Sequence, residues 1–502
     1  MAFGADADMS DAATTPSKDQ VAGGFDLIDA HNPKAPEPAH EVASLQRSRI
    51  LRKLDLRILP MMLITYGLQF LDKALLGYAA VYSMREDTHL HGQQYSWIGS
   101  IFYFGYMVFE YPLASFLRYF PSSLYLGFFI VVWGICVMMT NFCTNFAGLM
   151  VNRFVLGALE SVVAPSFVVI TAQWYTREEQ PIRQVIWFAG TPLFGIFGGL
   201  LGYAFGFTHT AVASWRLLYI VFGSVTTIFG IFFALFFPSS PDKASFLTED
   251  ERTYITMMSQ DGHNSFESKW KWSQVIEACL DIKTYLFFVI GIANTIPSGS
   301  LSNFSSLLIK GFGFTDVQTQ LIGIPSHIVQ ITSLLVSGLI ATKTRNLSLI
   351  IMSLCVVPSI LGTALVYVLP STNQWGRVVA VWIIYTNSAS LAVSFSVISG
   401  NVAGFTKRTT VTFLLFIGYC VGNLIAPQFF LKSEEKEGYP TAIIAMIISF
   451  SLLFVIPLAL RYLYYAENKR RDLLAEEDGA ELNERDNIDM TDIQDRSFRY
   501  AL

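Results

Sequence analysis

The sequence predicts an all-α membrane protein in which twelve transmembrane helices form two six-helix bundles. The chain has 502 residues, of which 52% are hydrophobic and 15% are charged, and its mean hydropathy is +0.44. Its apolar residues gather in twelve runs, most of them free of charge over the roughly 20 residues that a spanning helix needs. A soluble globular protein, a disordered chain and a nucleic-acid-binding protein all fit this composition poorly.

Residues 1–46 are predicted to be a disordered cytoplasmic tail. They are rich in Ala, Asp, Pro and Ser and contain no apolar run, so they bury too little surface to offset the entropy of ordering. A secretory signal would place an apolar stretch close to the start, whereas the first one here begins near Ile58. We therefore expect no cleaved signal.

The remaining chain divides into an N-terminal bundle (47–237), a polar central loop (238–283), a C-terminal bundle (284–465) and an acidic tail (466–502) that we expect to be soluble. The long loop after the sixth span, among otherwise short loops, indicates two stacked halves. The predicted spans, in order, are about 58–82, 95–118, 122–141, 146–172, 183–206, 215–237, 284–309, 318–341, 347–369, 378–400, 410–430 and 440–464.

The fifth and eleventh spans share a pattern that favours an internal repeat. Each carries one proline and a stripe of small residues at four-residue intervals, which lets helices approach closely. The stripes are Gly198, Gly202 and Gly206 in the fifth span, and Gly418, Gly422 and Ala426 in the eleventh.

The distribution of Lys and Arg predicts the orientation. If the N-terminus is cytoplasmic, 21 of these residues fall in cytoplasmic loops and helix ends and 6 on the other side. Because cytoplasmic loops are enriched in positive residues, both termini are expected in the cytoplasm.

Charged residues inside the spans are the strongest functional signal, since each costs at least about 2.5 kcal/mol at the bilayer centre. All of them lie in the first half. They are Asp72 and Lys73 in the first span, Glu110 in the second, and Arg153 and Glu160 in the fourth.

Arg153 and Glu160 lie seven residues apart, so they share one helix face, and Gln69 extends the polar face of the first span. We expect Asp72 near Arg153, with a guest anion exchanging for that carboxylate. A proton on Asp72 or Glu160 would free a cation to hold a substrate carboxylate. The alternatives are a purely structural ion-pair network, a Lys73 that only neutralises Asp72, and a Glu110 that serves as a gate or capping contact.

The second half offers neutral candidates. His327 is the only histidine within a span, and Asn303 and Asn387 are candidate substrate contacts; the alternative for all three is packing or helix capping. The five cysteines, Cys136, Cys143, Cys279, Cys355 and Cys420, show no ligand spacing, so no disulfide framework, metal or cofactor is expected.

Several segments together resemble the major facilitator superfamily, and within it the fungal allantoate permease-like branch of the anion:cation symporter family. In the first half these are FLDKALLGYA, NRFVLGALESVVAPSF, QWYTREEQPIRQVIW and WRLLYIVFGSVT. SNFSSLLIKGFGFTD, LIGIPSHIVQI and NVAGFTKRTTVTFLLFIGYCVGNLIAPQFF extend the resemblance through the second half, so that it covers about residues 50–465.

The resemblance implies two bundles that rock around a central site. It implies proton coupling by Asp72 and Glu160 and substrate binding by Arg153. Lys73 stands where such proteins often have Arg, which puts a bidentate contact there in doubt. The segment LASFLRYFPSS keeps Arg118 but lacks the superfamily's usual Asp, so gating at that loop is expected to differ.

We therefore expect a monomeric plasma-membrane symporter whose partners are protons, a small carboxylate such as a vitamin-like or ureide acid, and the lipid bilayer, with no nucleic acid. The alternatives are an exporter or intracellular transporter of a specialised metabolite, and a nutrient sensor without net flux. An integral membrane enzyme is disfavoured, because no catalytic motif lies within the spans.

Overall fold

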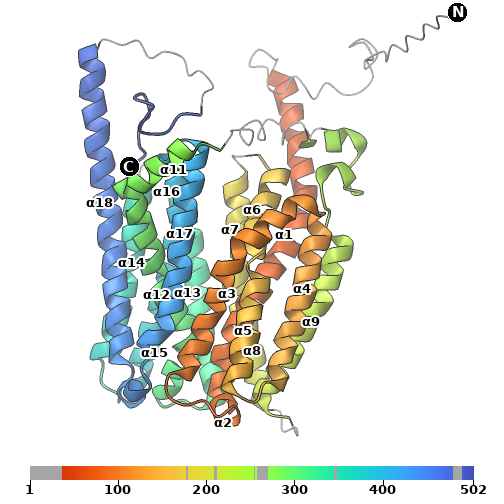
Figure 1. Cartoon of the computed structure of the whole chain (residues 1–502), viewed down its shortest axis with the longest axis vertical. Coiled ribbons are helices and arrows are strands. Elements are labelled where there is room, and N and C mark those ends of the chain that lie inside the picture. Colours follow the sequence, from red (N-terminus) through yellow and green to blue (C-terminus); the bar gives the residue numbers. More distant parts are fainter. Residues whose placement is uncertain are drawn as a thin grey trace, which may run out of the picture.

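Figure 1 shows the computed structural model of the chain, whose regular structure is helical. The structure describes residues 37–176, 179–207, 212–253, 255–256, 270–343, 347–478 and 489–502. The predicted N-terminal tail falls mostly outside these residues, and its last part, 37–46, already belongs to the first helix.

The first half contains six membrane-crossing units, two of which are broken into two helices. The unbroken ones are α1 (Glu37–Val81), α3 (Gln94–Phe116), α4 (Ser122–Met139) and α9 (Ser214–Phe236). The broken ones are α5 (Phe146–Glu160) with α6 (Val163–Trp174), and α7 (Gln180–Phe188) with α8 (Gly190–Phe205). A short helix, α2 (Met84–Asp87), follows α1.

The second half also has six such units among the described residues, of which one is broken. Its unbroken units are α12 (Ile282–Gly311), α13 (Asp316–Lys343), α14 (Ser348–Val368), α17 (Phe405–Ile425) and α18 (Pro440–Asp478). Its broken unit is α15 (Gln374–Ile384), the 3-10 turn η7 (Tyr385–Asn387) and α16 (Ser388–Asn401). Between the halves, α11 (Trp272–Leu280) lies in the predicted central loop. Within the second half, the 3-10 turns η8 (Ala426–Phe429) and η9 (Lys432–Glu437) join α17 to α18.

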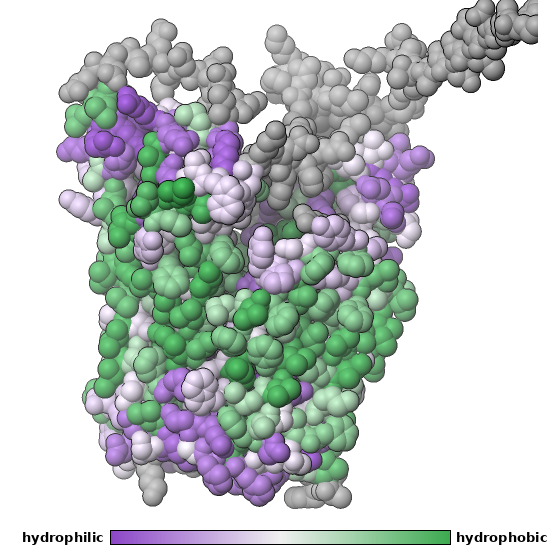
Figure 2. Space-filling view, viewed as in Figure 1, coloured by the Kyte–Doolittle hydropathy of each residue, from purple (hydrophilic) through white to green (hydrophobic). Residues whose placement is uncertain are grey.

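Eleven helical segments among the described residues are long and apolar enough to cross a membrane. The remaining predicted span is α3, whose Glu110 and several tyrosines make it less apolar. Figure 1 shows α3 lying among these helices with the same orientation. Figure 2 shows a wide apolar band across both halves, bounded at each end by hydrophilic residues, as a bilayer-embedded protein requires.

A glycine in each half makes a close contact of the same kind. A Cβ on Gly190 would lie 2.3 Å from the carbonyl oxygen of Leu63 in α1, and a Cβ on Gly418 would lie 2.4 Å from that of Phe288 in α12. The fifth span thus packs against the first as the eleventh packs against the seventh, which supports the predicted repeat.

The molecule has two polar ends. We call the end that carries the start of α1, α11 and the last residues of the chain the terminal face, and the end with α2 and η9 the opposite face (Figure 1). In the acidic tail, which was predicted to be soluble, α18 continues to Asp478, and residues 489–502 pack against the terminal face. Asp492 and Tyr500 are buried there because they find charged and aromatic partners.

Candidate functional site

The helices α1 and α5 bring the predicted charged residues together in the first half. A glycine lets α5 lie close to the neighbouring α3: a Cβ on Gly157 of α5 would lie 1.9 Å from the carbonyl oxygen of Phe102 in α3. Gln69 of α1 donates from Nε2 to the backbone carbonyl of Glu160 at 3.1 Å. The polar faces predicted for the first and fourth spans therefore meet each other.

Asp72 and Arg153 are neighbours, as expected, but Arg153 reaches the backbone of Asp72 and not its carboxylate. The indole nitrogen of Trp133 donates to Asp72 Oδ2 at 2.6 Å. Arg153 donates to the backbone carbonyl of Asp72 at 3.3 Å and to the hydroxyl of Tyr219 at 2.7 Å. With 2% of its surface exposed, Arg153 is held inside the first half.

The ion pair in this region joins Lys73 to Glu160, with Nζ and Oε2 3.5 Å apart. The side chain of Glu160 is fully buried and that of Lys73 is 16% exposed. The ammonium group also lies over the rings of Phe102 and Tyr106, at 5.5 and 5.3 Å from their centroids. Lys73 therefore pairs with Glu160 and not with Asp72.

Several polar atoms of this group lack a hydrogen-bond partner among the described residues. They are Asp72 Oδ1, Arg153 Nε and both carboxylate oxygens of Glu160. Buried polar atoms are normally satisfied, and exceptions are typical of functional sites. The arrangement can thus accept a proton or a further polar ligand.

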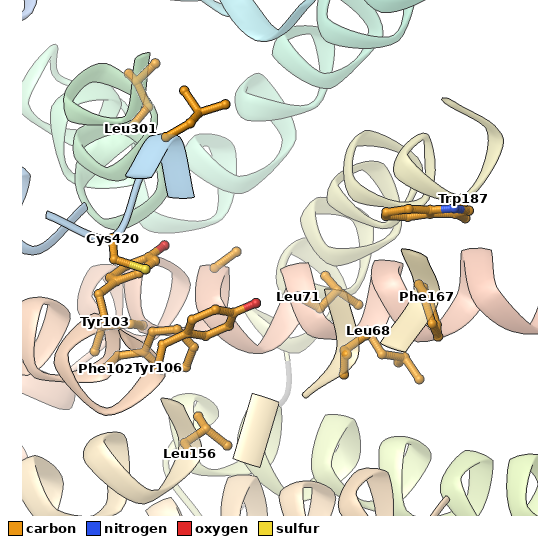
Figure 3. Close-up of a cluster of buried hydrophobic side chains, with 14 of the residues drawn as sticks. Leu68, Leu71, Phe102, Tyr103, Tyr106, Leu156, Phe167, Trp187, Leu301 and Cys420 are labelled. Carbon is orange, nitrogen blue, oxygen red and sulfur yellow. The ribbon is translucent and has the colours of Figure 1, made fainter. Parts of the chain in front are cut away.

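The charged group faces the second half across an aromatic layer. Lys73 lies over the rings of Phe102 and Tyr106 in α3, and Figure 3 shows Cys420 of α17 beside Tyr103 of the same helix. The ring centroids of Tyr103 and Tyr419 are 6.4 Å apart. Glu110, partly buried, lies four residues after Tyr106 on α3, so the two side chains share one face of that helix.

The three neutral candidates of the second half lie buried in the structure, and His327 Nδ1 lies 3.4 Å from Gln330 Oε1 in its own helix. The ring of His327 packs edge-on to Phe70 of α1 and to Tyr385, with centroids 5.6 and 5.8 Å away. Asn303 donates to the carbonyl of Gly299 at 2.8 Å within its own helix. Asn387 is buried in η7. His327 thus lies where the two halves meet, apart from the Lys73–Glu160 pair.

Near the opposite face, polar contacts join the halves. Arg85 of α2 pairs with Glu435 of η9 at 2.8 Å. Lys310 of α12 donates to the carbonyl of Val81 at 2.8 Å. Further contacts run from Tyr95 to the carbonyl of Asn303, from Ser100 to the carbonyl of Leu424, and from Gln428 to Ser100.

Sequence reasoning missed the partners of the predicted charges. Trp133 and Tyr219 are two among 9 Trp and 22 Tyr residues, so nothing in the sequence distinguishes them. It also missed Lys407, which was assigned to a loop but is 1% exposed in the first turn of α17. Lys407 forms an ion pair with Asp492 in the C-terminal tail, and no pattern near either residue in the sequence indicates that the two meet.

Comparison with known proteins identifies the fold and the family. The Major Facilitator Superfamily model matches residues 62–427. Two solved structures share the fold at low identity. A bacterial homolog of the human lysosomal transporter Spinster, inward-facing and unoccupied, has a TM-score of 0.61 at 16% identity, over 81% of this chain and 95% of that one. A D-xylose-proton symporter has a TM-score of 0.60 at 10% identity, over 80% and 97%.

Fungal relatives are similar over nearly the whole chain. An uncharacterized transporter of Schizosaccharomyces pombe is 36% identical, covering 90% of this chain and 87% of its own. In Saccharomyces cerevisiae, allantoate permease is 32% identical over 93% and 89% of the two chains, and the thiamine pathway transporter THI73 is 33% identical over 90% and 86%.

Proposed function

Because the chain belongs to the major facilitator superfamily, we propose that it is a secondary active transporter that carries a small organic anion together with a proton by alternating access. The chain is a multi-pass membrane protein, and its family and relatives are membrane transporters, not enzymes. The nature of the cargo and the coupling to protons are argued below from the buried charges.

The observation that carries the proposal is the pair of Lys73 and Glu160 at the boundary between the halves. Its two charges are 3.5 Å apart, and both oxygens of Glu160 lack a hydrogen-bond partner among the described residues. Removing the countercharge from a buried ion costs on the order of 3–5 kcal/mol. A change at one partner therefore strongly affects what the other binds.

This coupling links proton uptake to anion binding. When a proton neutralises Glu160, Lys73 loses its countercharge and is free to pair with a substrate carboxylate. When the substrate leaves, Lys73 again needs the Glu160 carboxylate, which releases its proton. Both states contain one positive and one negative charge, so the site stays neutral through the cycle.

The geometry supports Lys73, in place of Arg153, as the direct substrate contact. Arg153 is held by Tyr219 and by the backbone of Asp72, whereas Lys73 is partly exposed. Arg153 then positions α1 relative to α5, and Trp133 holds one oxygen of Asp72. Allantoate permease among the relatives supports a ureide acid or similar carboxylate as the cargo.

We further propose that the terminal face is cytoplasmic and the membrane is the plasma membrane. The excess of Lys and Arg on that face supports the orientation. The polar contacts between the halves near the opposite face would then close the outer side of the protein. We call these contacts the outer gate.

The test is a panel of radiolabelled carboxylic acids offered to a transport-deficient host at acidic and neutral external pH. At least one acid should enter faster at acidic pH. Glu160→Gln should remove this pH effect, and Arg153→Ala should reduce uptake, while Glu249→Gln, an exposed carboxylate on the terminal face, should change neither.

If neither Glu160→Gln nor Arg153→Ala alters flux or its pH dependence, the coupling scheme is wrong. Accumulation of a compound in cells that lack the protein would instead indicate export. Binding of an acid without any net flux would indicate a sensor.

A further inference from the structure

A second charged cluster lies at the terminal face of the second half, away from the proposed transport site. Lys407, in the first turn of α17, and Lys283, in the first turn of α12, point at the same carboxylate. Lys407 Nζ lies 2.8 Å from Asp492 Oδ1, and Lys283 Nζ lies 3.2 Å from Asp492 Oδ2. Asp281 and Glu277 complete the cluster around the two lysines.

We propose that this cluster is a binding site whose ligand is the chain's own C-terminal segment, residues 489–502. The site is built from α11, α12, α17, α18 and the link between α16 and α17. The bound segment fastens the terminal-face ends of these elements to one another.

The site recognises the backbone of the segment. The guanidinium group of Arg471 in α18 donates to the carbonyls of Asp492, Asp495 and Phe498 at 2.8, 3.1 and 2.9 Å. Asn468 exchanges two hydrogen bonds with the backbone of Tyr500, at 2.8 and 2.9 Å. A chain held by this many side-chain contacts is fixed along its length.

Two side chains give the site its selectivity. The ring of Tyr500 stacks on Tyr464 of α18 with centroids 4.6 Å apart and planes at 13°. Its hydroxyl donates to Asp492 Oδ2 at 2.6 Å and accepts from Lys283 at 2.8 Å. Asp492 is 1% exposed and Tyr500 is 4% exposed, so both act as buried anchors.

The link between α16 and α17 contacts the segment at a glycine, Gly404, where a side chain would crowd it. Gly404 has a φ of +83°, which L-residues with a side chain rarely adopt. A Cβ there would lie 3.0 Å from Thr491 of the segment and 3.0 Å from Gln274 of α11. At the same place, the amide of Phe405 donates to Asp489 at 2.7 Å.

The charge of Asp492 persists at neutral pH. Burial alone would raise the pKa of this carboxyl, but Lys283, Lys407 and the hydroxyl of Tyr500 together lower it. Breaking a buried ion pair from one side leaves an uncompensated charge, which is why the segment stays bound.

The test uses the full-length protein and hydrogen–deuterium exchange of the peptide that covers residues 489–502. The wild-type segment should exchange slowly. Asp492→Ala should speed exchange at least about tenfold, since it removes both lysine contacts. The matched control is Ile493→Ala, the exposed neighbour, which should leave exchange unchanged.

Tyr500→Phe is the second variant, because it keeps the stacked ring and removes only the hydroxyl. It should give an intermediate increase in exchange, which keeps the proposal testable if Asp492→Ala does not fold. The proposal is overturned if the wild-type segment already exchanges at the rate of an unfolded peptide. It is equally overturned if the segment exchanges at the same rate in Asp492→Ala as in Ile493→Ala. Where Asp492→Ala does not fold, Tyr500→Phe takes its place in this comparison. Transport activity is not needed for this readout.

Discussion

Lys73 is placed between a buried carboxylate and two aromatic rings, and its ammonium group is partly exposed. This combination differs from that of Arg153, whose guanidinium is enclosed by Tyr219 and a backbone carbonyl. A cation that exchanges partners must be reachable by its ligand. We therefore assign ligand exchange to Lys73 and a positioning role to Arg153.

The first prediction follows from this assignment. Replacing Lys73 with Gln should raise the KM for the transported acid at least about tenfold, because a hydrogen bond to a charged group contributes roughly 1.5–3 kcal/mol. Lys53→Gln, which removes a lysine paired with Glu251 at the terminal face, should leave KM unchanged. Initial-rate uptake measurements give both values. A normal KM in Lys73→Gln together with a raised KM in Arg153→Gln would indicate that Arg153, and not Lys73, contacts the substrate.

The sequence was sufficient to find the charged residues but not their pairing. Charges inside apolar spans are rare enough to stand out, which is why Asp72, Lys73, Arg153 and Glu160 could be predicted. Which acid meets which base depends on the rotation and depth of α1 relative to α5. The 3.6-residue period does not specify these quantities, so the expectation that Asp72 lies near Arg153 did not include the Lys73–Glu160 pair that is observed.

At the scale of helices, breaks and glycines determine where the charges lie. The helix α5 ends at Glu160 and α6 begins at Val163, so the buried carboxylate stands at a C-terminal helix end. The negative end of the helix dipole adds to its preference for a nearby cation. Apolar runs predicted the spans themselves well. They could not predict such breaks, because the sequence stays apolar across them.

The second prediction concerns the contact between α3 and α5. Gly157→Ala should destabilise the protein by about 1–3 kcal/mol, because the new Cβ would clash with the carbonyl of Phe102 in α3. Gly338→Ala, in α13, is the control, since no atom lies within 4 Å of its Cβ position. Thermal unfolding of the purified proteins should show a lower Tm for Gly157→Ala alone. Equal Tm values for the two variants would show that α3 and α5 have room to separate.

At the scale of the whole molecule, the contacts near the opposite face hold the two halves together on one side. The proposed cycle requires these contacts to break and re-form while the internal pair exchanges its proton. The docked segment 489–502 contacts α11 and the helices of the second half, so it would move with that half. The polar composition of this segment is typical of a solvated tail. Its ion pairs with Lys283 and Lys407, which are distant in the sequence, become visible only in the folded structure.

The third prediction concerns the ion pair of Arg85 and Glu435 at the opposite face. Burial alone would raise the pKa of Glu435, but hydrogen bonds from Arg85 and Lys432 lower it from 4.5 to about 2. The stabilisation from a lowered pKa is fully present above the ordinary value and is lost as the pH falls through the lowered one. Between pH 4.5 and neutrality, this ion pair should therefore hardly respond to acid.

Glu435→Gln should consequently alter uptake by less than about fivefold, as expected for a partly exposed pair. It should keep the ratio of uptake at mildly acidic to uptake at neutral pH. Parallel uptake assays of wild type and variant measure that ratio. If Glu435→Gln abolished the stimulation of uptake by acid, the pH-sensitive group would be Glu435 and not Glu160.

If a proton and a carboxylate exchange at the Lys73–Glu160 pair, each acid molecule that enters brings a proton with it. In proteoliposomes loaded with a pH-sensitive dye, adding the transported acid as its salt should acidify the lumen with wild-type protein. Glu160→Gln should exchange labelled for unlabelled substrate without any acidification. Uptake by the wild type with no change in lumen pH, or full acidification by Glu160→Gln, would contradict the account.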